Sequence, residues 1–137
     1  MQTDNRWVFE SNDPLEARTH RDAFVAYLRH QATPDSDFEA AELVYGELIG
    51  NVVRHAYGHI KVVVEWRDGM ATLCVADHGG GFSRNFTLPE SGADFNRGML
   101  ENGRGLSIVR RLSSAVCVEC DTAGCEVRAV LPVRRAA

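Results

Sequence analysis

Residues 60–77 read IKVVVEWRDGMATLCVAD, two apolar runs joined by the dipeptide Asp68-Gly69. Asp-Gly between two such runs favours a type I′ turn, which connects neighbouring antiparallel strands through a two-residue loop. A loop of that length also fixes the register of the two strands. The segment therefore predicts a β-hairpin with strands over residues 60–67 and 70–77.

One face of this predicted hairpin is apolar except at its far end. Side chains alternate between the two faces of a strand, so the register assigns each residue to a face. The apolar or small members of the first face are Ile60, Val62, Val64, Trp66, Ala71, Leu73 and Val75. The remaining member is Asp77. A carboxylate on the core face needs a partner or a pocket, so Asp77 is a candidate functional residue.

Upstream of the hairpin, the sequence predicts a short strand over residues 6–11 and then a helix. Residues 13–16 read DPLE, which combines an N-cap aspartate, a proline in the first turn and a capping-box glutamate. The helix is expected to run to about residue 31, where Thr33-Pro34 ends it.

A second helix is expected from residues 36–39, which read SDFE and repeat the capping-box signature. It should run to about residue 57, with Gly58 as its C-terminal stop. Within it, Leu43, Leu48 and Val52 are expected to face the sheet.

Downstream of the hairpin, residues 78–102 show no periodicity and are rich in Gly, Asn and Ser. Loops longer than about 12–15 residues are usually functional or mobile. A third helix over residues 104–113 and strands over 115–121 and 125–133 complete the chain. The order β-α-α-β-β-α-β-β predicts an α+β fold, a two-layer α/β sandwich. Its mixed, mostly antiparallel sheet would be covered on one face by helices.

Length and composition indicate one globular domain spanning residues 1–137, with 45% hydrophobic and 25% charged residues. The net charge of −4, from 15 basic and 19 acidic residues, argues against direct nucleic-acid binding. No apolar run approaches the roughly 18 residues of a membrane span. The polar first residues lack the apolar core of a signal peptide. We therefore expect a cytoplasmic protein with no membrane contact.

The four cysteines are Cys74, Cys117, Cys120 and Cys125. In a reducing cytoplasm, free thiols are expected rather than bridges. Cys117 and Cys120 have the spacing of a metal or redox pair. In a strand, however, residues three apart point to opposite faces, so this pair is not expected to chelate one ion.

Three short patterns carry the candidate chemistry. Glu47, Asn51 and His55 are spaced by four along the second helix and stack along one face, although such a set alone is also compatible with a solvated face. Residues 77–82 read DHGGGF at the end of a strand, which by itself is equally a flexible loop. Residues 103–106 read GRGL and open the third helix, where glycines let backbone amides approach an anion.

Taken together and in this order, the three patterns resemble the GHKL ATPase superfamily, whose ATP site is the Bergerat fold. The resemblance rests on a helix with Glu and Asn one turn apart, a DxGxG motif after a strand, and a GxGL motif before a helix. It extends from the second helix to the last strand. Within the superfamily, the small size and residues 47–57 (ELIGNVVRHAY) are most similar to the anti-sigma factor serine kinases of bacterial partner switching.

The resemblance implies a Mg·ATP site with a role for each matching residue. Asn51 would coordinate Mg²⁺, which prefers oxygen ligands and keeps phosphates and waters in its shell. Asp77 would accept a hydrogen bond from the adenine amino group. Glu47 would be the catalytic base that accepts the proton of an attacking serine or threonine hydroxyl. The other nucleotide-binding residues implied are His55, Gly79, Gly81, Gly103, Arg104, Gly105 and Leu106.

These further residues would shape the loops around the nucleotide. Gly79 and Gly81 would let the chain pass close to it, and residues 103–105 would wrap the phosphates, with Arg104 adding charge. Residues 83–102 would form the ATP lid. His55 would order the phosphate end or cap its own helix.

The sequence departs from the superfamily pattern in two places. Many members carry a Gly-Thr pair at the start of the last strand, where the threonine supports the adenine-binding acid. Here the pair is Gly124-Cys125, and a thiol is a weaker donor than a hydroxyl. This implies a lower adenine affinity or a compensating water. The lid is also short and lacks a clear third glycine motif.

The resemblance implies an ATP-dependent protein serine/threonine kinase that acts as an anti-sigma-type regulator of transcription. Its implied partners are a STAS-domain anti-anti-sigma substrate, a sigma factor or downstream effector, and a second copy of the chain through the first strand and first helix.

Three other functions remain open. One is a nucleotide-gated switch that binds a phosphatase or other effector without kinase activity, although the intact Glu47 favours catalysis. Another is a hydrolase in which Glu47 activates water. The third is a histidine-kinase catalytic domain, which shares the ATP site. Only about 35 residues precede the second helix, however, and these are too few for a dimerisation helix pair.

Overall fold

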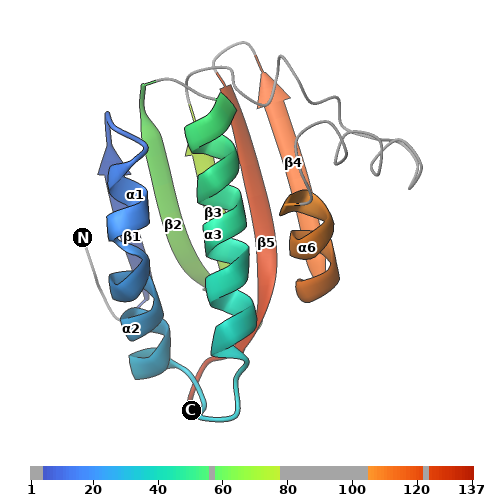
Figure 1. Ribbon diagram of the computed structural model, residues 1–137. Coiled ribbons are helices and arrows are strands. Elements are labelled where there is room, and N and C mark those ends of the chain that lie inside the picture. Colours follow the sequence, from blue (N-terminus) through green and yellow to red (C-terminus); the bar gives the residue numbers. More distant parts are fainter. Residues whose placement is uncertain (1–4, 56–57, 78–104, 122–123) are drawn as a thin grey trace.

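A five-stranded sheet with helices on one of its faces forms the described part of the protein (Figure 1). The computed structural model describes residues 5–55, 58–77, 105–121 and 124–137. In chain order the elements are β1 (Arg6–Ser11), α1 (Glu16–Thr19), α2 (Arg21–Gln31), α3 (Phe38–His55), β2 (Ile60–Arg67), β3 (Met70–Asp77), α6 (Gly105–Leu112), β4 (Ala115–Asp121) and β5 (Gly124–Arg134). This is the predicted α+β two-layer architecture. Each pair of neighbouring strands in the described sheet is antiparallel, so the sheet is not mixed.

The central hairpin of β2 and β3 has the predicted register, because Ile60 pairs with Asp77 and Trp66 with Ala71. Asp68 and Gly69 have φ values of 52° and 78°. Two positive φ angles in a two-residue loop are those of the type I′ turn that Asp-Gly favours. The predicted core face is buried at every position except Trp66, which is half-buried.

The sheet order is β1-β2-β3-β5-β4, so the last strand in sequence lies beside the hairpin and β4 lies at an edge. Asp77, at the end of β3, pairs with Cys125 near the start of β5. On its other side, Cys125 pairs with Cys120 of β4. The end of the sheet that carries Asp77 is therefore built from three neighbouring strands.

The predicted first helix is interrupted at His20, which has φ −95° and ψ 8° and separates α1 from α2. The Thr19 hydroxyl donates a 2.7 Å hydrogen bond to the Glu16 carbonyl oxygen, and the His20 ring Nδ1 lies 3.0 Å from the same oxygen. In a continuous helix that carbonyl would accept the His20 amide. The amide instead bonds to the Ala17 carbonyl at 3.3 Å. Local side-chain hydrogen bonds thus compete with the helix, as is common for threonine.

Helix α3 begins at Phe38, and its cap is Asp37 rather than the predicted Ser36. The Asp37 Oδ1 accepts a 3.0 Å hydrogen bond from the Ala40 amide, whereas the Ser36 hydroxyl oxygen accepts one from the Arg134 amide. Leu48 and Val52 face the core as predicted. Leu43 does not, because 49% of it is exposed. Its helical position lies one turn before Glu47, on the side of α3 away from the sheet.

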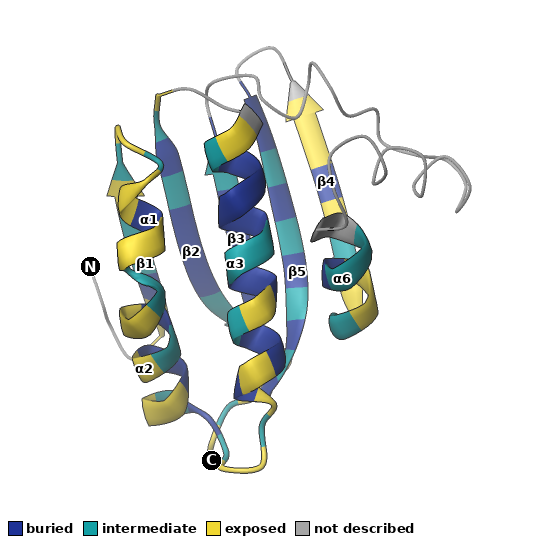
Figure 2. Cartoon of the chain, in the orientation of Figure 1, coloured by how far each residue is buried: buried dark blue, intermediate teal, exposed yellow. Residues whose placement is uncertain are grey.

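The core lies between the helices and the sheet, and Figure 2 shows its buried residues concentrated on α3 and the central strands. The rings of Phe24 and Tyr45 stack with their centroids 4.5 Å apart. The Tyr45 hydroxyl donates a 2.6 Å hydrogen bond to the Ala17 carbonyl. Burial raises the pKa of this hydroxyl well above its usual value, and the nearby Arg21 opposes the shift more weakly. These contacts anchor α1 and α2 against α3.

Cys120 and Cys125 form a disulfide, so the expectation of four free thiols is wrong for this pair. Their Cα atoms lie 4.1 Å apart because the two residues are direct cross-strand partners in the β4–β5 hairpin. Neither the cellular compartment nor the Cys117–Cys120 spacing indicates this pairing. Cys74, which is buried, and Cys117, which is exposed, are free.

Candidate functional site

The last turns of α3 carry the first group of predicted site residues. Asn51 is buried, with 2% of it exposed, and its Oδ1 accepts a 2.5 Å hydrogen bond from Nη2 of Arg54. Glu47 lies one turn earlier and is half-buried. Because residues four apart share a helix face, the Glu47 carboxylate and the Asn51 amide lie on the same side of α3.

Asp77 is the second predicted site residue, and only 1% of it is exposed. It ends β3 on the core face, between Ile60 of β2 and Cys125 of β5, which are both buried. Removing a carboxylate from water among apolar neighbours has a large free-energy cost unless polar groups compensate. Such a position is more readily explained by a ligand or a polar network than by packing.

Burial of polar side chains marks these residues out. Apart from aromatic and thiol-bearing side chains, the described part of the chain buries three polar residues, Asn51, Thr72 and Asp77. Two of the three are residues that the sequence predicted for the site. Strongly buried polar groups in a protein of this size are a signal of function, because hydrophobic residues would fill the same space at lower cost.

The predicted groups meet at one end of the molecule. Figure 1 shows the C-terminal end of α3, the end of β3 and the start of β5 at the same end of the sheet. The N-terminal end of α6 is turned toward this end. Helix α6 packs against α3, and its Val109 is buried in the hydrophobic core. A helix N-terminus directed at this region suits a negatively charged ligand.

Several predicted residues fall outside what the structure describes. Gly79, Gly81, Gly103 and Arg104 lie within residues 78–104, which are outside the described residues. Gly105 opens α6, in agreement with the predicted helix start. For two further residues, His55 at the end of α3 and Leu106 in α6, the backbone is helical but the side chain is outside the described part.

Arg54 is a site residue that the sequence reasoning missed. Its guanidinium group holds the oxygen of the Asn51 amide, which makes it a positioning residue for that amide. Arginine three residues after asparagine on a helix is a spacing that brings the two side chains together, so helical spacing could have signalled this contact.

A hollow of about 440 Å³ lies elsewhere, on the sheet face opposite the helices. It is lined by residues that include Arg67, Thr72, Cys117 and Arg128, and by none of the predicted site residues that the structure describes. Each of its two arginines already pairs with a glutamate, at 3.1 Å for Arg67 and 2.6 Å for Arg128. This hollow therefore does not compete with the α3–β3 end as the candidate site.

Comparison with known proteins identifies the family. The protein-family model of the histidine kinase-like ATPase domain matches residues 11–131 of this chain. The chain belongs to the histidine kinase-like ATPase domain family. This confirms the predicted resemblance to the GHKL ATPases, and ATP is the nucleotide that such a domain implies.

Two curated proteins of Mycobacterium tuberculosis resemble this ATPase domain in sequence. The sensor histidine kinase component HK1 of strain H37Rv is 35% identical over 98 residues, which cover 64% of this chain and 58% of that protein. The probable sensor histidine kinase HK of strain CDC 1551 is 35% identical over 98 residues, covering 64% of this chain and 26% of that protein. The chain thus spans about half, or less, of the length of these relatives.

Two solved structures share the fold. The RsbU and RsbW domains of Rv1364c from Mycobacterium tuberculosis match 96% of this chain and 34% of that chain, with a TM-score of 0.61 and 17% identity. The histidine kinase domain of the blue-light activated histidine kinase EL346 from Erythrobacter litoralis matches 85% of this chain and 61% of that chain, with a TM-score of 0.54 and 21% identity. At these identities the likeness concerns the fold. No described helix is long and apolar enough to cross a membrane.

Proposed function

We propose that this ATPase domain is a protein serine/threonine kinase and anti-sigma-type regulator that phosphorylates a STAS-domain anti-anti-sigma protein. The observation that carries the proposal is the buried Asn51, with the half-buried Glu47 one turn earlier, at the same end of the sheet as the buried Asp77. This arrangement offers an oxygen ligand, a proton acceptor and an adenine acceptor from two adjacent elements.

Asn51 fits the role of a magnesium ligand. Its amide is almost fully buried, and Arg54 fixes the direction of its oxygen. An amide oxygen is a neutral, hard ligand of the kind that Mg²⁺ accepts beside phosphate oxygens. When bound, Mg²⁺ would neutralise charge on the triphosphate. The part of this chain is to present one oxygen in a fixed position.

Asp77 fits the role of an adenine acceptor. A carboxylate oxygen in an apolar environment forms a strong hydrogen bond with an amino group, because charge-assisted bonds gain strength where water is excluded. The pairing of Asp77 with Ile60 and Cys125 holds it between two backbone neighbours, so its position is set by the sheet.

Glu47 fits the role of the general base. Phosphoryl transfer depends mainly on positioning and on stabilising charge, and a carboxylate within hydrogen-bond reach can accept the proton of an attacking hydroxyl. Glu47 is half-buried, in contrast to the fully buried Val44 and Leu48 that flank it. A half-buried base is open to a hydroxyl carried by another protein.

The partner assignment rests on resemblance and on one feature of the sheet. Residues 47–57 are similar to the anti-sigma kinases, and the fold match to the RsbU and RsbW domains covers 96% of this chain. We assign a STAS-domain substrate, a sigma factor or downstream effector as the second partner, and a cytoplasmic location. β1 is an edge strand beside α1, and Leu15 at the start of α1 is 53% exposed, which supports a homodimer through this edge.

A second candidate is the catalytic domain of a histidine kinase, favoured by the names of the two Mycobacterium tuberculosis relatives. The two functions differ in the bond formed, a phosphate ester on serine or threonine against a phosphoramidate on histidine. The phosphoramidate hydrolyses in acid, whereas the ester survives.

The test is to incubate the chain with γ-labelled ATP, magnesium and candidate STAS proteins, and then to wash the labelled product in acid. Acid-stable label on a STAS serine or threonine is the expected result. Label lost in acid would identify histidine chemistry and overturn the proposal. ATP binding without transfer to any candidate would favour the nucleotide-gated switch.

A further inference from the structure

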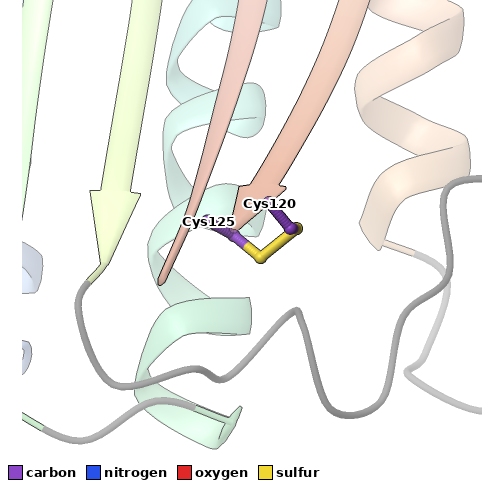
Figure 3. Close-up of a disulfide and its surroundings, with 2 residues drawn as sticks. All are labelled: Cys120 and Cys125. Carbon is purple, nitrogen blue, oxygen red and sulfur yellow. A yellow bond between two sulfur atoms is a disulfide. The ribbon is translucent and has the colours of Figure 1, made fainter. Parts of the chain in front are cut away.

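The Cys120–Cys125 disulfide lies directly beside the predicted adenine acceptor. Cys125 pairs with Cys120 of β4 on one side and with Asp77 of β3 on the other. Figure 3 shows the two sulfurs at the end of β4 beside the start of β5. In an antiparallel pair, the Cβ atoms of directly opposed residues lie about 4.5–5.5 Å apart. One residue of β5 therefore connects the disulfide to Asp77.

The two cysteines differ in exposure. Cys125 is buried, with 3% of it exposed, whereas Cys120 is exposed at the edge strand. A thiol reagent from solvent therefore meets Cys120 first, while the chemical change also alters a sulfur in the core. Reduction of the disulfide at the exposed Cys120 therefore also changes the chemistry of Cys125, beside the buried end of β3.

The disulfide contributes little as a staple. Its sequence separation is 5, and β4 and β5 are already paired along seven positions by the hairpin register. A disulfide that closes a short loop removes less entropy from the unfolded chain than one that closes a long loop. Stability alone is therefore a weak reason for the bond, and disulfides in a reducing compartment are typically redox-sensing or catalytic.

We propose that Cys120–Cys125 is a reversible thiol–disulfide site whose reduction tightens adenine nucleotide binding at Asp77. The proposal rests on the nucleotide site proposed above. The co-reactant is a dithiol reductant of the thioredoxin class. Its thiolate attacks the exposed sulfur of Cys120, the Cys120–Cys125 bond breaks, and the sulfur of Cys125 leaves as a thiolate that takes a proton.

The second thiolate of the reductant then attacks the reductant's first sulfur, which is bonded to Cys120 in the mixed disulfide. Cys120 is released as a thiolate, which also takes a proton. The protein disulfide gains two electrons and two protons, and the reductant becomes a disulfide. The reverse exchange with a disulfide oxidant restores the bond. Atoms and electrons balance in both directions.

Reduction changes what Cys125 offers to its neighbour. In the disulfide, its sulfur carries no hydrogen and is bonded toward Cys120. In the reduced form, the S–H group is a weak donor that can point toward the Asp77 carboxylate. Burial keeps such a thiol protonated, because a thiolate among apolar groups is disfavoured. A donor on Asp77 orients the carboxylate before adenine arrives.

Neither free cysteine offers a competing pair. Cys117 is on the opposite face of β4 from Cys120, since it lies three positions earlier in the same strand. Cys74 is buried on the outer face of β3, and burial raises its pKa to about 11. A thiol that resists ionisation is a poor nucleophile at neutral pH.

The experiment measures Mg·ATP affinity by calorimetry for the whole 137-residue chain, oxidised and then reduced with a dithiol. Alkylation of the unfolded chain in denaturant, followed by mass spectrometry, counts the free thiols, which should be Cys74 and Cys117 in the oxidised form and all four cysteines in the reduced form. We expect the reduced form to bind roughly threefold to tenfold more tightly, the effect of one weak hydrogen bond.

Two variants separate loss of the bond from loss of the donor. Cys120→Ser cannot form the disulfide but keeps the Cys125 thiol, so it should bind as tightly as the reduced protein under both conditions. Cys125→Ala lacks both, so it should bind as weakly as the oxidised protein under both conditions. Cys117→Ser is the matched control and should keep the full redox response. Circular dichroism confirms that each variant is folded.

The other possible outcomes each contradict one part of the proposal: the redox response, the thiol donor or the nucleotide site. Equal affinity in the two redox states, or four reactive thiols after oxidation, overturns the redox proposal and leaves the nucleotide site intact. Tight binding by Cys125→Ala would show that the thiol donor has no role. Failure of every form to bind Mg·ATP would overturn the nucleotide site itself, and the redox proposal with it.

Discussion

Replacing Asp77 with asparagine tests the adenine acceptor while preserving size and shape. Asp77 is 1% exposed and is held between Ile60 and Cys125, so the amide occupies the same place. A hydrogen bond to a charged group contributes about 1.5–3 kcal/mol. At about 1.4 kcal/mol per tenfold change, the Kd for ATP should rise roughly 10- to 150-fold. The free protein should not lose stability, because the amide keeps the shape of the side chain and removes the cost of burying a charge.

The assay is calorimetric titration of Mg·ATP, combined with urea unfolding of the free protein. The matched control is Glu126→Gln, the same chemical change one residue after Cys125 but on the outer face of the sheet, where Glu126 pairs with Ala76. Unchanged ATP affinity in Asp77→Asn would show that the carboxylate does not bind adenine. An equal loss in the control would show the same, because the effect would then come from net charge and not from adenine.

Three further predictions concern the helix, the outer face of the sheet and the hairpin turn. Asn51→Ala should abolish the magnesium dependence of ATP binding. Arg54→Ala leaves the amide oxygen in place and should weaken ATP binding only roughly threefold to tenfold. Equal ATP affinities of the wild type with and without magnesium would contradict the role of Asn51 as a magnesium ligand. Burial raises the pKa of Cys74 from 9.0 to about 11, so the thiol loses its proton at lower pH in the unfolded chain than in the folded protein. The free energy of unfolding should therefore fall as the pH rises between these two values. Chemical denaturation over this pH range should show a shallower fall in Cys74→Ala. Gly69→Ala places a side chain at φ 78° and should lower stability by about 1–2 kcal/mol. Gly50→Ala within α3 should raise stability by about 0.5–1 kcal/mol, because among the described residues the added Cβ meets Arg54 at an ordinary contact distance of 3.5 Å. Thermal unfolding of the two variants measures this contrast.

The hairpin and the fold class could be predicted because local chemistry decides them. Asp68-Gly69 supplies the two positive φ angles that its turn requires, and the turn fixes which residues share a face. That face then placed Asp77 in the core, where the structure has it. The position of β5 between β3 and β4 needed more than local chemistry, because it depends on which strands meet after α6.

The errors arose where a long-range or side-chain contact decides the outcome. The break at His20 follows from hydrogen bonds of Thr19 and His20 to one carbonyl, which helix propensity does not contain. The disulfide follows from a direct cross-strand pairing that the spacing of Cys117 and Cys120 did not suggest. Neither contact is part of the hydrophobic periodicity from which helices and strands are predicted.

The candidate site was predictable in part. The spacing of Glu47 and Asn51 gave their shared helix face, and the structure adds that Asn51 is buried and that Arg54 holds it. The glycine motifs at residues 79–81 and 103–104 lie outside the described residues and stay predictions. For Asn51, burial was the information that the spacing lacked, because burial depends on which elements pack around α3.

The role of Glu47 is tested by comparing wild type with Glu47→Gln in two assays on the same samples, Mg·ATP binding and transfer of the γ-phosphoryl group to a STAS protein. The variant should bind Mg·ATP with wild-type affinity and transfer at least about a hundredfold more slowly, the usual contribution of a general base. Transfer at the wild-type rate would show that the half-buried carboxylate beside Asn51 is not the base.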